Sequence, residues 1–195
     1  FNLREVCEAT IAYIKDETTD ILSIMPAPDF SLGASIVYDK DEMRNIYETG
    51  RGSFKMRAKY RYDKSSNCIE ITEIPYSTTS EAIIGKIMEY LKANKLREIS
   101  DARDETDLDG FKIAIDLKRG VDPDALMLKL YKMTPLEDSF ACNFNILINS
   151  VPKVMGVKEI LNEWIKFRIT CIRNGARVDI EQKNKRLHLL MGLKK

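Results

Sequence analysis

The sequence lacks an excess of charge of either sign. Its 195 residues include 31 Lys and Arg against 30 Asp and Glu, which leaves a formal net charge of +1 at pH 7. Chains that bind nucleic acid through their overall charge are strongly basic, and this chain is not. A nucleic-acid surface must therefore arise from cations gathered locally on one part of the fold.

Long apolar segments are also lacking. No stretch approaches the roughly 20 apolar residues that cross a bilayer, so we expect no membrane association. A secretory signal is missing too, and the first residue is Phe1 rather than Met. We therefore expect a piece of a longer protein. With 44% hydrophobic and 31% charged residues, the composition is typical of a globular chain that can bury a core.

Patterns that bind metal are missing. The four cysteines, Cys7, Cys68, Cys142 and Cys171, lie far apart, and His188 is the only histidine. A zinc site needs closely spaced ligands, so we expect no metal site. Reduced cysteines at small core positions are the favoured interpretation. His188 is expected on a helix surface or in packing.

What the sequence does contain is a strand–turn–strand–helix unit that occurs twice. Each unit has two alternations of apolar and polar residues, a turn between them, and a following segment with helical spacing. The first unit comprises residues 53–62, 63–67, 68–74 and 78–91, and the second comprises residues 97–103, 104–110, 111–117 and 125–132. We interpret the two units as a ββα quasi-repeat.

Local signals place further elements. Thr78 with Glu81 predicts a capping box, and Asp122-Pro123 predicts an N-cap followed by a first-turn proline. Gly50 stands where a left-handed residue ends a helix. The remaining predicted elements are helices at 3–15 and 41–48 and strands at 34–38 and 140–149.

The C-terminal part reads as one long helix from about Val157. Ile160, Leu161, Trp164 and Ile165 are predicted to form its core face. The predicted fold class is therefore α+β, with a mixed or antiparallel sheet, ββα quasi-repeats and a long C-terminal helix leading toward a coiled coil. We expect one α+β domain over residues 1–156 and the helix of a coiled-coil arm over residues 157–195.

The strongest functional signal in the residues themselves is a stripe of cations. Lys55, Arg57, Lys59 and Arg61 alternate with apolar residues in a segment predicted as one strand. Residues two apart on a strand recur every ~6.6 Å on one face, so four of them form a row about 20 Å long. Such a row could follow DNA phosphates, and Arg51 could extend it. The alternative is a solvated face neutralised by cross-strand acids such as Glu70.

An acidic run also requires interpretation. It consists of Asp101, Asp104, Glu105, Asp107 and Asp109. Alternating oxygen ligands suit calcium or magnesium, but the run lacks the EF-hand pattern and contains a cation. A solvated hairpin turn that closes at 109–110 is the favoured interpretation.

Several motifs, in order, resemble those of the DNA-breaking A subunit of bacterial type IIA DNA topoisomerases. These enzymes are DNA gyrase and topoisomerase IV. They are residues 26–30 (PAPDF), 47–52 (YETGRG), 72–76 (TEIPY), 99–110 (ISDARDETDLDG) and 186–189 (RLHL). The resemblance covers nearly the whole chain and is to the tower-like segment of the breakage-reunion core. Residues 77–80 depart from the family pattern and lack a cation often found there.

This resemblance implies a function for the whole protein and a narrower one for this chain. The family is an ATP-dependent isomerase whose catalytic tyrosine, paired with an arginine, would lie upstream of Phe1, so no catalytic residue is expected here. Magnesium and ATP would come through the partner B subunit, and two A subunits would form a homodimer mostly through other regions. The implied location is cytoplasmic and nucleoid-associated. The chain would bind and bend double-stranded DNA through Arg51, Lys55, Arg57, Lys59 and Arg61, and would couple it to the exit gate.

A second hypothesis belongs to a different class. The chain could be a non-enzymatic module with a ββα repeat that binds protein partners through its C-terminal helix. Salt-sensitive binding to duplex DNA favours the first hypothesis, and a stoichiometric protein complex without DNA affinity favours the second.

Overall fold

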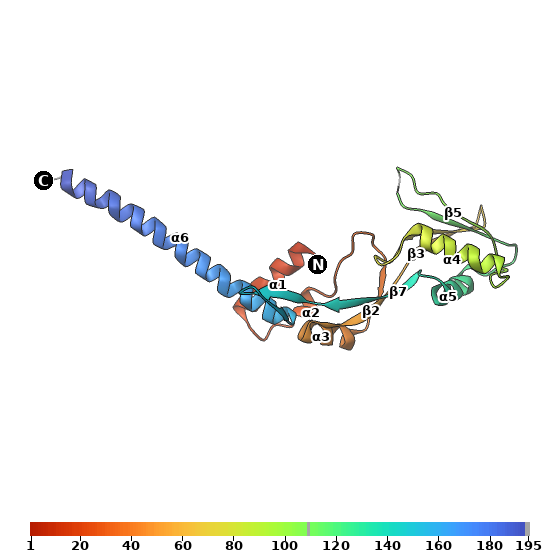
Figure 1. The fold of residues 1–195 in the computed structure, drawn as a ribbon, viewed down its shortest axis with the longest axis horizontal. Coiled ribbons are helices and arrows are strands. Elements are labelled where there is room, and N and C mark those ends of the chain that lie inside the picture. The colour runs from red at the N-terminus through yellow and green to blue at the C-terminus, as the bar shows by residue number, and fades with distance from the viewer. Residues whose placement is uncertain (109, 194–195) are drawn as a thin grey trace.

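The computed structural model describes residues 1–108 and 110–193 and has an elongated shape with three parts (Figure 1). A lobe built on one sheet lies in the middle, a lobe built on a second sheet lies at one end, and a long helix extends from the other end. The predicted α+β class is confirmed, and every strand pairing is antiparallel.

The middle part, which we call the sheet A lobe, contains three strands in the order β1-β2-β7. Its elements are α1 (Leu3–Lys15), α2 (Ile21–Ile24), β1 (Ser35–Val37), α3 (Lys40–Thr49), β2 (Arg51–Arg57) and β7 (Glu137–Asn143). Alternate residues of β2, Phe54 and Met56, are buried against these helices, because one face of the sheet meets the helical layer. Gly50 ends α3 with a left-handed φ of 72°, as predicted.

The end part, the sheet B lobe, contains the two ββα units. They are β3 (Lys59–Asp63), β4 (Cys68–Glu73) and α4 (Ser80–Lys92), then β5 (Ile99–Asp104), β6 (Ile113–Leu117) and α5 (Pro123–Met133). The strand order is β3-β4-β6-β5, so the second strands of the two units pair in the centre. The apolar residues of both helices share one core with the isoleucines of β4 and β6.

The prediction of one continuous strand over residues 53–62 is wrong. The chain leaves sheet A after Arg57 and enters sheet B at Lys59, and Ala58 lies between the two sheets. Ala58 is buried, its N–H donates to the Leu136 carbonyl (2.8 Å), and its carbonyl accepts from the Tyr131 hydroxyl (2.9 Å). These bonds give the buried N–H and carbonyl of Ala58 hydrogen-bond partners outside both sheets. The alternation of apolar and polar residues can therefore continue through the crossing.

A second correction concerns residues 140–149. Instead of one strand, β7 ends at Asn143 and a separate hairpin follows, formed by β8 (Asn145–Ile148) and β9 (Val151–Val154). Asn149 and Ser150 join these strands, both with positive φ (52° and 66°), which is the geometry of a two-residue type I′ turn.

Smaller corrections concern single residues. The N-cap of α4 is Thr79, whose hydroxyl accepts from the Ala82 N–H (3.3 Å), rather than Thr78. The Asp122 cap of α5 is confirmed. Core positions are confirmed for Cys68 and Cys142, whereas Cys7 is exposed. All four cysteines are free.

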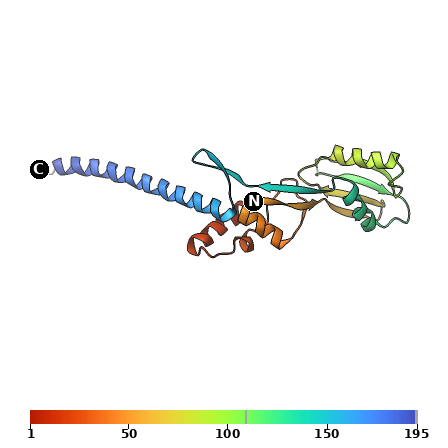
Figure 2. The same ribbon diagram turned by 60° about the horizontal axis from the view of Figure 1, so that its bottom comes forward.

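The predicted long helix is confirmed as α6 (Val157–Leu193), which runs without interruption through Gly175. Its predicted core face is confirmed at Leu161 and wrong at Trp164, which is 51% exposed. The reason is that only the first turns of α6 pack on the sheet A lobe, and the remainder projects into solvent (Figures 1 and 2). His188 lies exposed on this projecting part. Within the described ranges, every helix is too short or too polar to cross a membrane.

Candidate nucleic-acid interface

The outer face of sheet A is polar, basic and open to solvent. Side chains at alternate positions of a strand share a face, and residues directly opposite on paired strands point the same way. The register therefore collects three rows of outward residues, which are Ser35 and Val37 on β1, Arg51, Ser53, Lys55 and Arg57 on β2, and Glu137, Ser139, Ala141 and Asn143 on β7. Arg51, Lys55, Ser139 and Asn143 are exposed. In these three fully described strands Glu137 is the only outward acid.

Glu137 binds two of the cations. Its carboxylate accepts from Lys55 Nζ (3.1 Å) through one oxygen and from Arg57 Nε through the other. Arg57 stands directly opposite Glu137 in the register and also lies over the Tyr131 ring, 5.2 Å from its centroid. Burial raises the pKa of the Glu137 carboxyl, but the bonds from Arg57 and Lys55 outweigh burial and hold the pKa below its ordinary value. The carboxylate is therefore ionised at neutral pH.

Arg51 begins the row at the turn that follows α3. The Thr49 hydroxyl donates to the Asn45 carbonyl (2.7 Å) and accepts from the Arg51 N–H (3.2 Å), which ties this turn to the last turn of α3. The Arg51 side chain is exposed, and over residues 1–108 and 110–193 it forms no ion pair. Since Lys55 and Arg57 share one acid, the outer face of sheet A carries three cations and one carboxylate.

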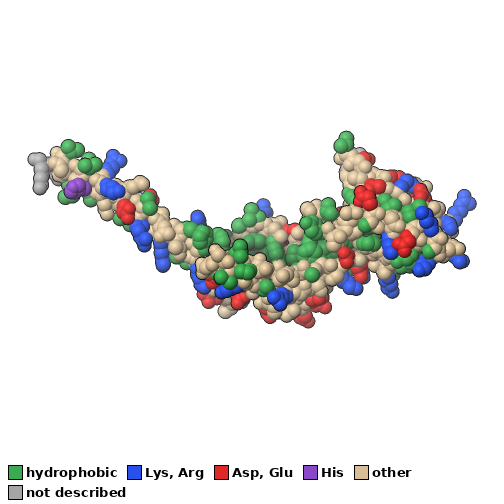
Figure 3. Space-filling model, viewed as in Figure 1, with side chains coloured by type: hydrophobic (Ala, Val, Ile, Leu, Met, Phe, Trp, Pro, Cys, Tyr) green, Lys and Arg blue, Asp and Glu red, His purple; other side chains and the backbone are tan. Residues whose placement is uncertain are grey.

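On the outer face of sheet B the cations are matched by acids. Lys59 Nζ lies 2.9 Å from Glu73, and Arg61 Nε donates to Glu70, its cross-strand neighbour. Lys59–Glu73 is a separate ion pair, and the other residues form one network of Arg61, Arg103 and Lys112 with Glu70, Asp101, Glu105 and Asp116. Four cations thus meet five carboxylates. Figure 3 shows blue and red side chains intermixed over this lobe.

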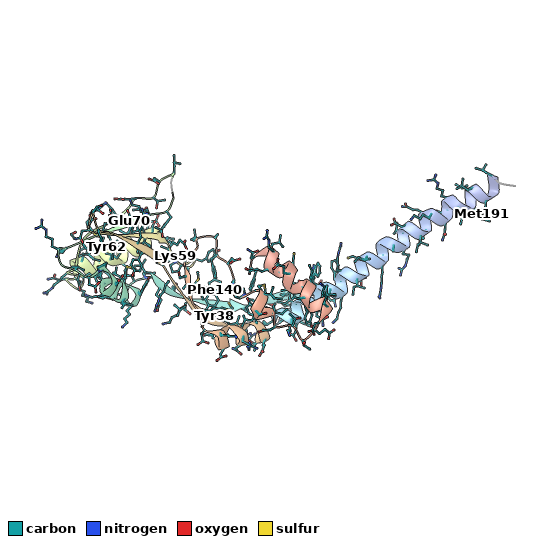
Figure 4. All side chains as sticks on the ribbon, turned by 180° about the vertical axis from the view of Figure 1, so that it is seen from behind. Tyr38, Lys59, Tyr62, Glu70, Phe140 and Met191 are labelled. Carbon is teal, nitrogen blue, oxygen red and sulfur yellow. The ribbon has the colours of Figure 1, made fainter. Side chains whose placement is uncertain are left out.

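Glu70 lies at the centre of the network. The hydrogen bond from Arg61, together with the one from Lys112, holds the pKa of the Glu70 carboxyl below its ordinary value. The cross-strand acid expected in the alternative interpretation of the stripe is thus present at Arg61. Figure 4 shows Glu70 and Tyr62 within the sheet B lobe and Lys59 closer to the crossing between the sheets.

Glu73 connects the two lobes. Besides its bond to Lys59, one carboxylate oxygen accepts from the Ala34 N–H (2.5 Å) in the loop before β1. Gly33 and Ala34 both have positive φ (73° and 79°), and a Cβ on Gly33 would lie 2.1 Å from that oxygen. The left-handed φ favours glycine at 33, and a side chain there would displace the Glu73 carboxylate from its bond to Ala34.

The predicted acidic turn is confirmed where the structure describes it. The backbones of Asp107 and Gly110 exchange hydrogen bonds (3.2 and 3.3 Å), whereas Asp109 lies outside the described residues. Asp101 and Glu105 contact Arg103. Within the described part of the chain no three His, Cys, Asp or Glu residues come together as a metal site.

The tyrosines of the stripe take part in packing. Tyr60 and Tyr62 lie against the sheet B core, as their alternation predicts. The Tyr60 hydroxyl donates to Asp124 (2.7 Å), and burial together with this bond raises its pKa to about 12. A phenol with such a pKa is a poor nucleophile at neutral pH.

The structure thus separates the predicted site residues into two groups, with Arg51, Lys55 and Arg57 on sheet A and Lys59 and Arg61 on sheet B. Sequence reasoning missed the residues that complete the sheet A face, namely Glu137, Ser139 and Asn143. The alternation of residues 137–143 could have indicated a strand, but its pairing with a segment about 80 residues earlier has no local signal.

Comparison with known proteins identifies the class of protein to which this chain belongs. The family of DNA gyrase and topoisomerase IV A subunits matches residues 1–195. The chain belongs to this family of type II topoisomerases.

Individual relatives agree. The chain is 35% identical to the DNA gyrase A protein of Borreliella burgdorferi and 37% identical to that of Ureaplasma parvum, in each case over 98% of this chain and 24% of the relative. It is also 36% identical to the probable chloroplastic/mitochondrial DNA gyrase A protein of Oryza sativa subsp. japonica, over 98% of this chain and 21% of the relative. The chain therefore spans about a quarter of the length of the curated relatives it matches.

Proposed function

We propose that this chain is a DNA-holding arm of a type II topoisomerase. The observation that carries the proposal is the outer face of sheet A, where three cations and one carboxylate stand among small side chains and where Arg51 and Lys55 are exposed. Arg51 and Arg57 lie six residues apart, which spans about 20 Å along the strand. A row of this length can contact several phosphates of one duplex.

Recognition of this kind depends on phosphates and DNA shape. Arg and Lys bind phosphate without reading base edges, and Ser and Asn side chains add uncharged donors. The proposed role is therefore to grip and bend the flanks of the cleaved duplex independently of sequence, with bending cost offset by further phosphate contacts. All five predicted cations belong to the proposal, with Arg51, Lys55 and Arg57 contributing more than Lys59 and Arg61.

The arm would also couple DNA to the exit gate. A tight joint supports this, because Gly50 and Gly156 each approach the other segment's backbone so closely that an added Cβ would lie 2.3 Å from a carbonyl oxygen. α6 therefore begins against the end of α3. Exposed apolar residues along its projecting part, including Phe167, Ile172 and Val178, favour a coiled-coil arm.

The rest of the reaction belongs, in this proposal, to other parts of the protein. Residues 1–156 form the tower-like DNA arm and residues 157–195 begin the coiled coil. The catalytic tyrosine lies outside the chain, which alone would not cleave DNA. Magnesium and ATP act through the partner B subunit, the A subunits form a homodimer mostly through other regions, and the holoenzyme works in the cytoplasm at the nucleoid.

Salt-dependent duplex binding tests the proposal. Each phosphate contact contributes ~0.9 to the slope of log K against log salt. Replacing Arg51, Lys55, Arg57, Lys59 and Arg61 by Gln should weaken binding of a labelled duplex and flatten that slope by several such steps. An unchanged affinity and slope in the folded variant would show that the cations are only solvated. A stoichiometric protein complex without DNA affinity would support the interaction module instead.

A further inference from the structure

Glu137 occupies a position that a phosphate would compete for. It is the single outward acid on β1, β2 and β7, and it stands at the Arg57 end of the cation row. Its side chain is 15% exposed, whereas those of Lys55 and Arg57 are 62% and 41% exposed. The carboxylate is thus far less exposed than the two cations that it binds.

We propose that Glu137 is an internal competing anion that weakens the hold of Lys55 and Arg57 on DNA phosphate. The inference rests on the proposed function and describes how the same face is regulated. It assigns to Glu137 a role opposite to that of its neighbours, although all three form one cluster.

Glu137 reduces the release of counterions at Lys55 and Arg57. A phosphate-binding cation gains free energy largely because small ions are released from DNA, and the gain scales with the number of phosphates neutralised. Lys55 and Arg57 are already partly neutralised by a carboxylate that cannot leave. A phosphate that approaches them meets less positive charge, so fewer counterions are released for the same contact.

Glu137 also occupies hydrogen-bond donors of both cations. Glu137 uses both of its oxygens, one for Lys55 Nζ and one for Arg57 Nε. The same donors would otherwise be available to phosphate oxygens, and charge-assisted bonds of this kind are among the stronger ones in proteins. Arg57 keeps its terminal nitrogens for phosphate, since Glu137 is bound through Nε. The face can therefore hold DNA while Glu137 stays in place, but less tightly.

Such a device suits an arm that must release what it holds. Arg51, at the other end of the row, provides an unattenuated contact, and the Lys55–Arg57 end provides a weaker one. Duplex can therefore leave from the Glu137 end first.

The test compares duplex affinity and its salt dependence for the 195-residue chain and its variants. Glu137→Gln removes the charge, keeps an acceptor oxygen and preserves the size of the side chain. We expect duplex binding to tighten about three- to tenfold at low salt, because one anion beside the phosphates is removed, and the effect should shrink as salt screens it. The salt slope should steepen by up to ~0.9 for each of the two released cations.

A matched control separates local competition from net charge. Glu181→Gln changes the net charge equally on the projecting part of α6, where Glu181 is exposed, and should leave duplex affinity within about twofold. In a background where Lys55 and Arg57 are both replaced by Gln, Glu137→Gln should lose most of its effect, since the donors it competes for are gone.

A second variant tests the idea without removing an ion pair. Ser139 is exposed and stands directly opposite Lys55. Ser139→Glu adds a carboxylate and should weaken binding about three- to tenfold, whereas Ser139→Gln should not. This pair keeps the inference testable if Glu137→Gln does not fold.

The outcomes distinguish the two proposals. If the chain binds duplex, loses affinity when Lys55 and Arg57 are replaced, and yet Glu137→Gln binds no tighter, the inference is overturned and the proposed function stands. The same holds if the Glu137→Gln effect persists in full without Lys55 and Arg57. If the unaltered chain binds no duplex at any salt concentration, the proposed function itself fails.

Discussion

Sheet A and sheet B share one alternating stretch of sequence, residues 51–63, yet they surround its cations differently. In sheet B, Glu73 binds Lys59 and Glu70 binds Arg61. Glu70 is shared with Lys112, but the carboxylates of these ion pairs outnumber the cations, five to four. In sheet A one acid serves two cations and Arg51 extends beyond it. Identical residue types in one pattern can therefore be neutralised to different degrees in two sheets, and the partner strand decides how far.

The largest expected effect separates the two lobes by stability. Ile115 is fully buried in sheet B. Ile115→Ala should therefore lower the free energy of unfolding by about 2–5 kcal/mol. The two lobes have separate cores, so hydrogen exchange should increase in β4 and β6 far more than in β2 and β7. Duplex affinity should stay unchanged.

Met56→Ala is the matched variant in the sheet A core, where Met56 is 1% exposed. It should show the reverse pattern, with faster exchange in β2 and weaker DNA binding. Equal loss of protection in both lobes for either variant would mean that they unfold as one unit.

The next effect separates the cations by function. Replacing Arg51, Lys55 and Arg57 by Gln should weaken duplex binding about ten- to hundredfold, or about 1.4–2.8 kcal/mol, because the least neutralised charges are lost. Replacing Lys59 and Arg61 should cost less than about threefold, since Glu73 and Glu70 neutralise them. Anisotropy titrations at two salt concentrations measure both, and equal losses per cation would remove the distinction between the sheets.

A smaller effect concerns the link between the lobes. Glu73→Ala removes the acceptor of the Ala34 N–H and should lower the unfolding free energy by about 1 kcal/mol. Glu73→Gln keeps an acceptor oxygen and should lower the unfolding free energy by less than Glu73→Ala does. Urea unfolding reports the stability, and exchange of the Ala34 amide reports the bond. If the Ala34 amide exchanges slowly in both variants, contacts other than the Glu73 bond hold the loop before β1 in place.

The smallest effect is a pH dependence specific to sheet B. The pKa of Glu70 is lower in the folded chain than its ordinary value of about 4.5. The Glu70 ion pairs therefore stabilise the fold fully above pH 4.5, and this stabilisation is lost as the pH falls through the lowered pKa. Between pH 6 and 3 the thermal midpoint should therefore fall more in the unaltered chain than in Glu70→Gln. Parallel curves would show that Glu70 contributes nothing to acid sensitivity.

Much of the fold could be predicted because its signals are local. The two ββα units are punctuated by turn residues, the Asp122-Pro123 cap is a short local feature, and α6 keeps helical spacing past Gly175. The hairpin of β8 and β9 was missed because Pro152 argues against a strand, although Pro is tolerated in a two-stranded edge pairing.

The division of the stripe could not be predicted in the same way. Ala58 is apolar and continues the alternation, so nothing in residues 53–62 marks the change of sheet. The five cations were visible in the sequence, but their degree of neutralisation depends on strands paired across long separations, above all Glu137 with Arg57. Local pattern identifies charged side chains, whereas only the sheet register identifies their counter-charges.

The unbroken course of α6 has a geometric consequence. Its 37 residues make a rod of about 55 Å, and its first turn lies close against the end of α3, where Gly50 and Gly156 let the two backbones approach. A tilt of only about 10° at that pivot carries the far end through about 10 Å. The chain is thus built as a lever, in which a small change of angle at the sheet A lobe becomes a large displacement at Leu193.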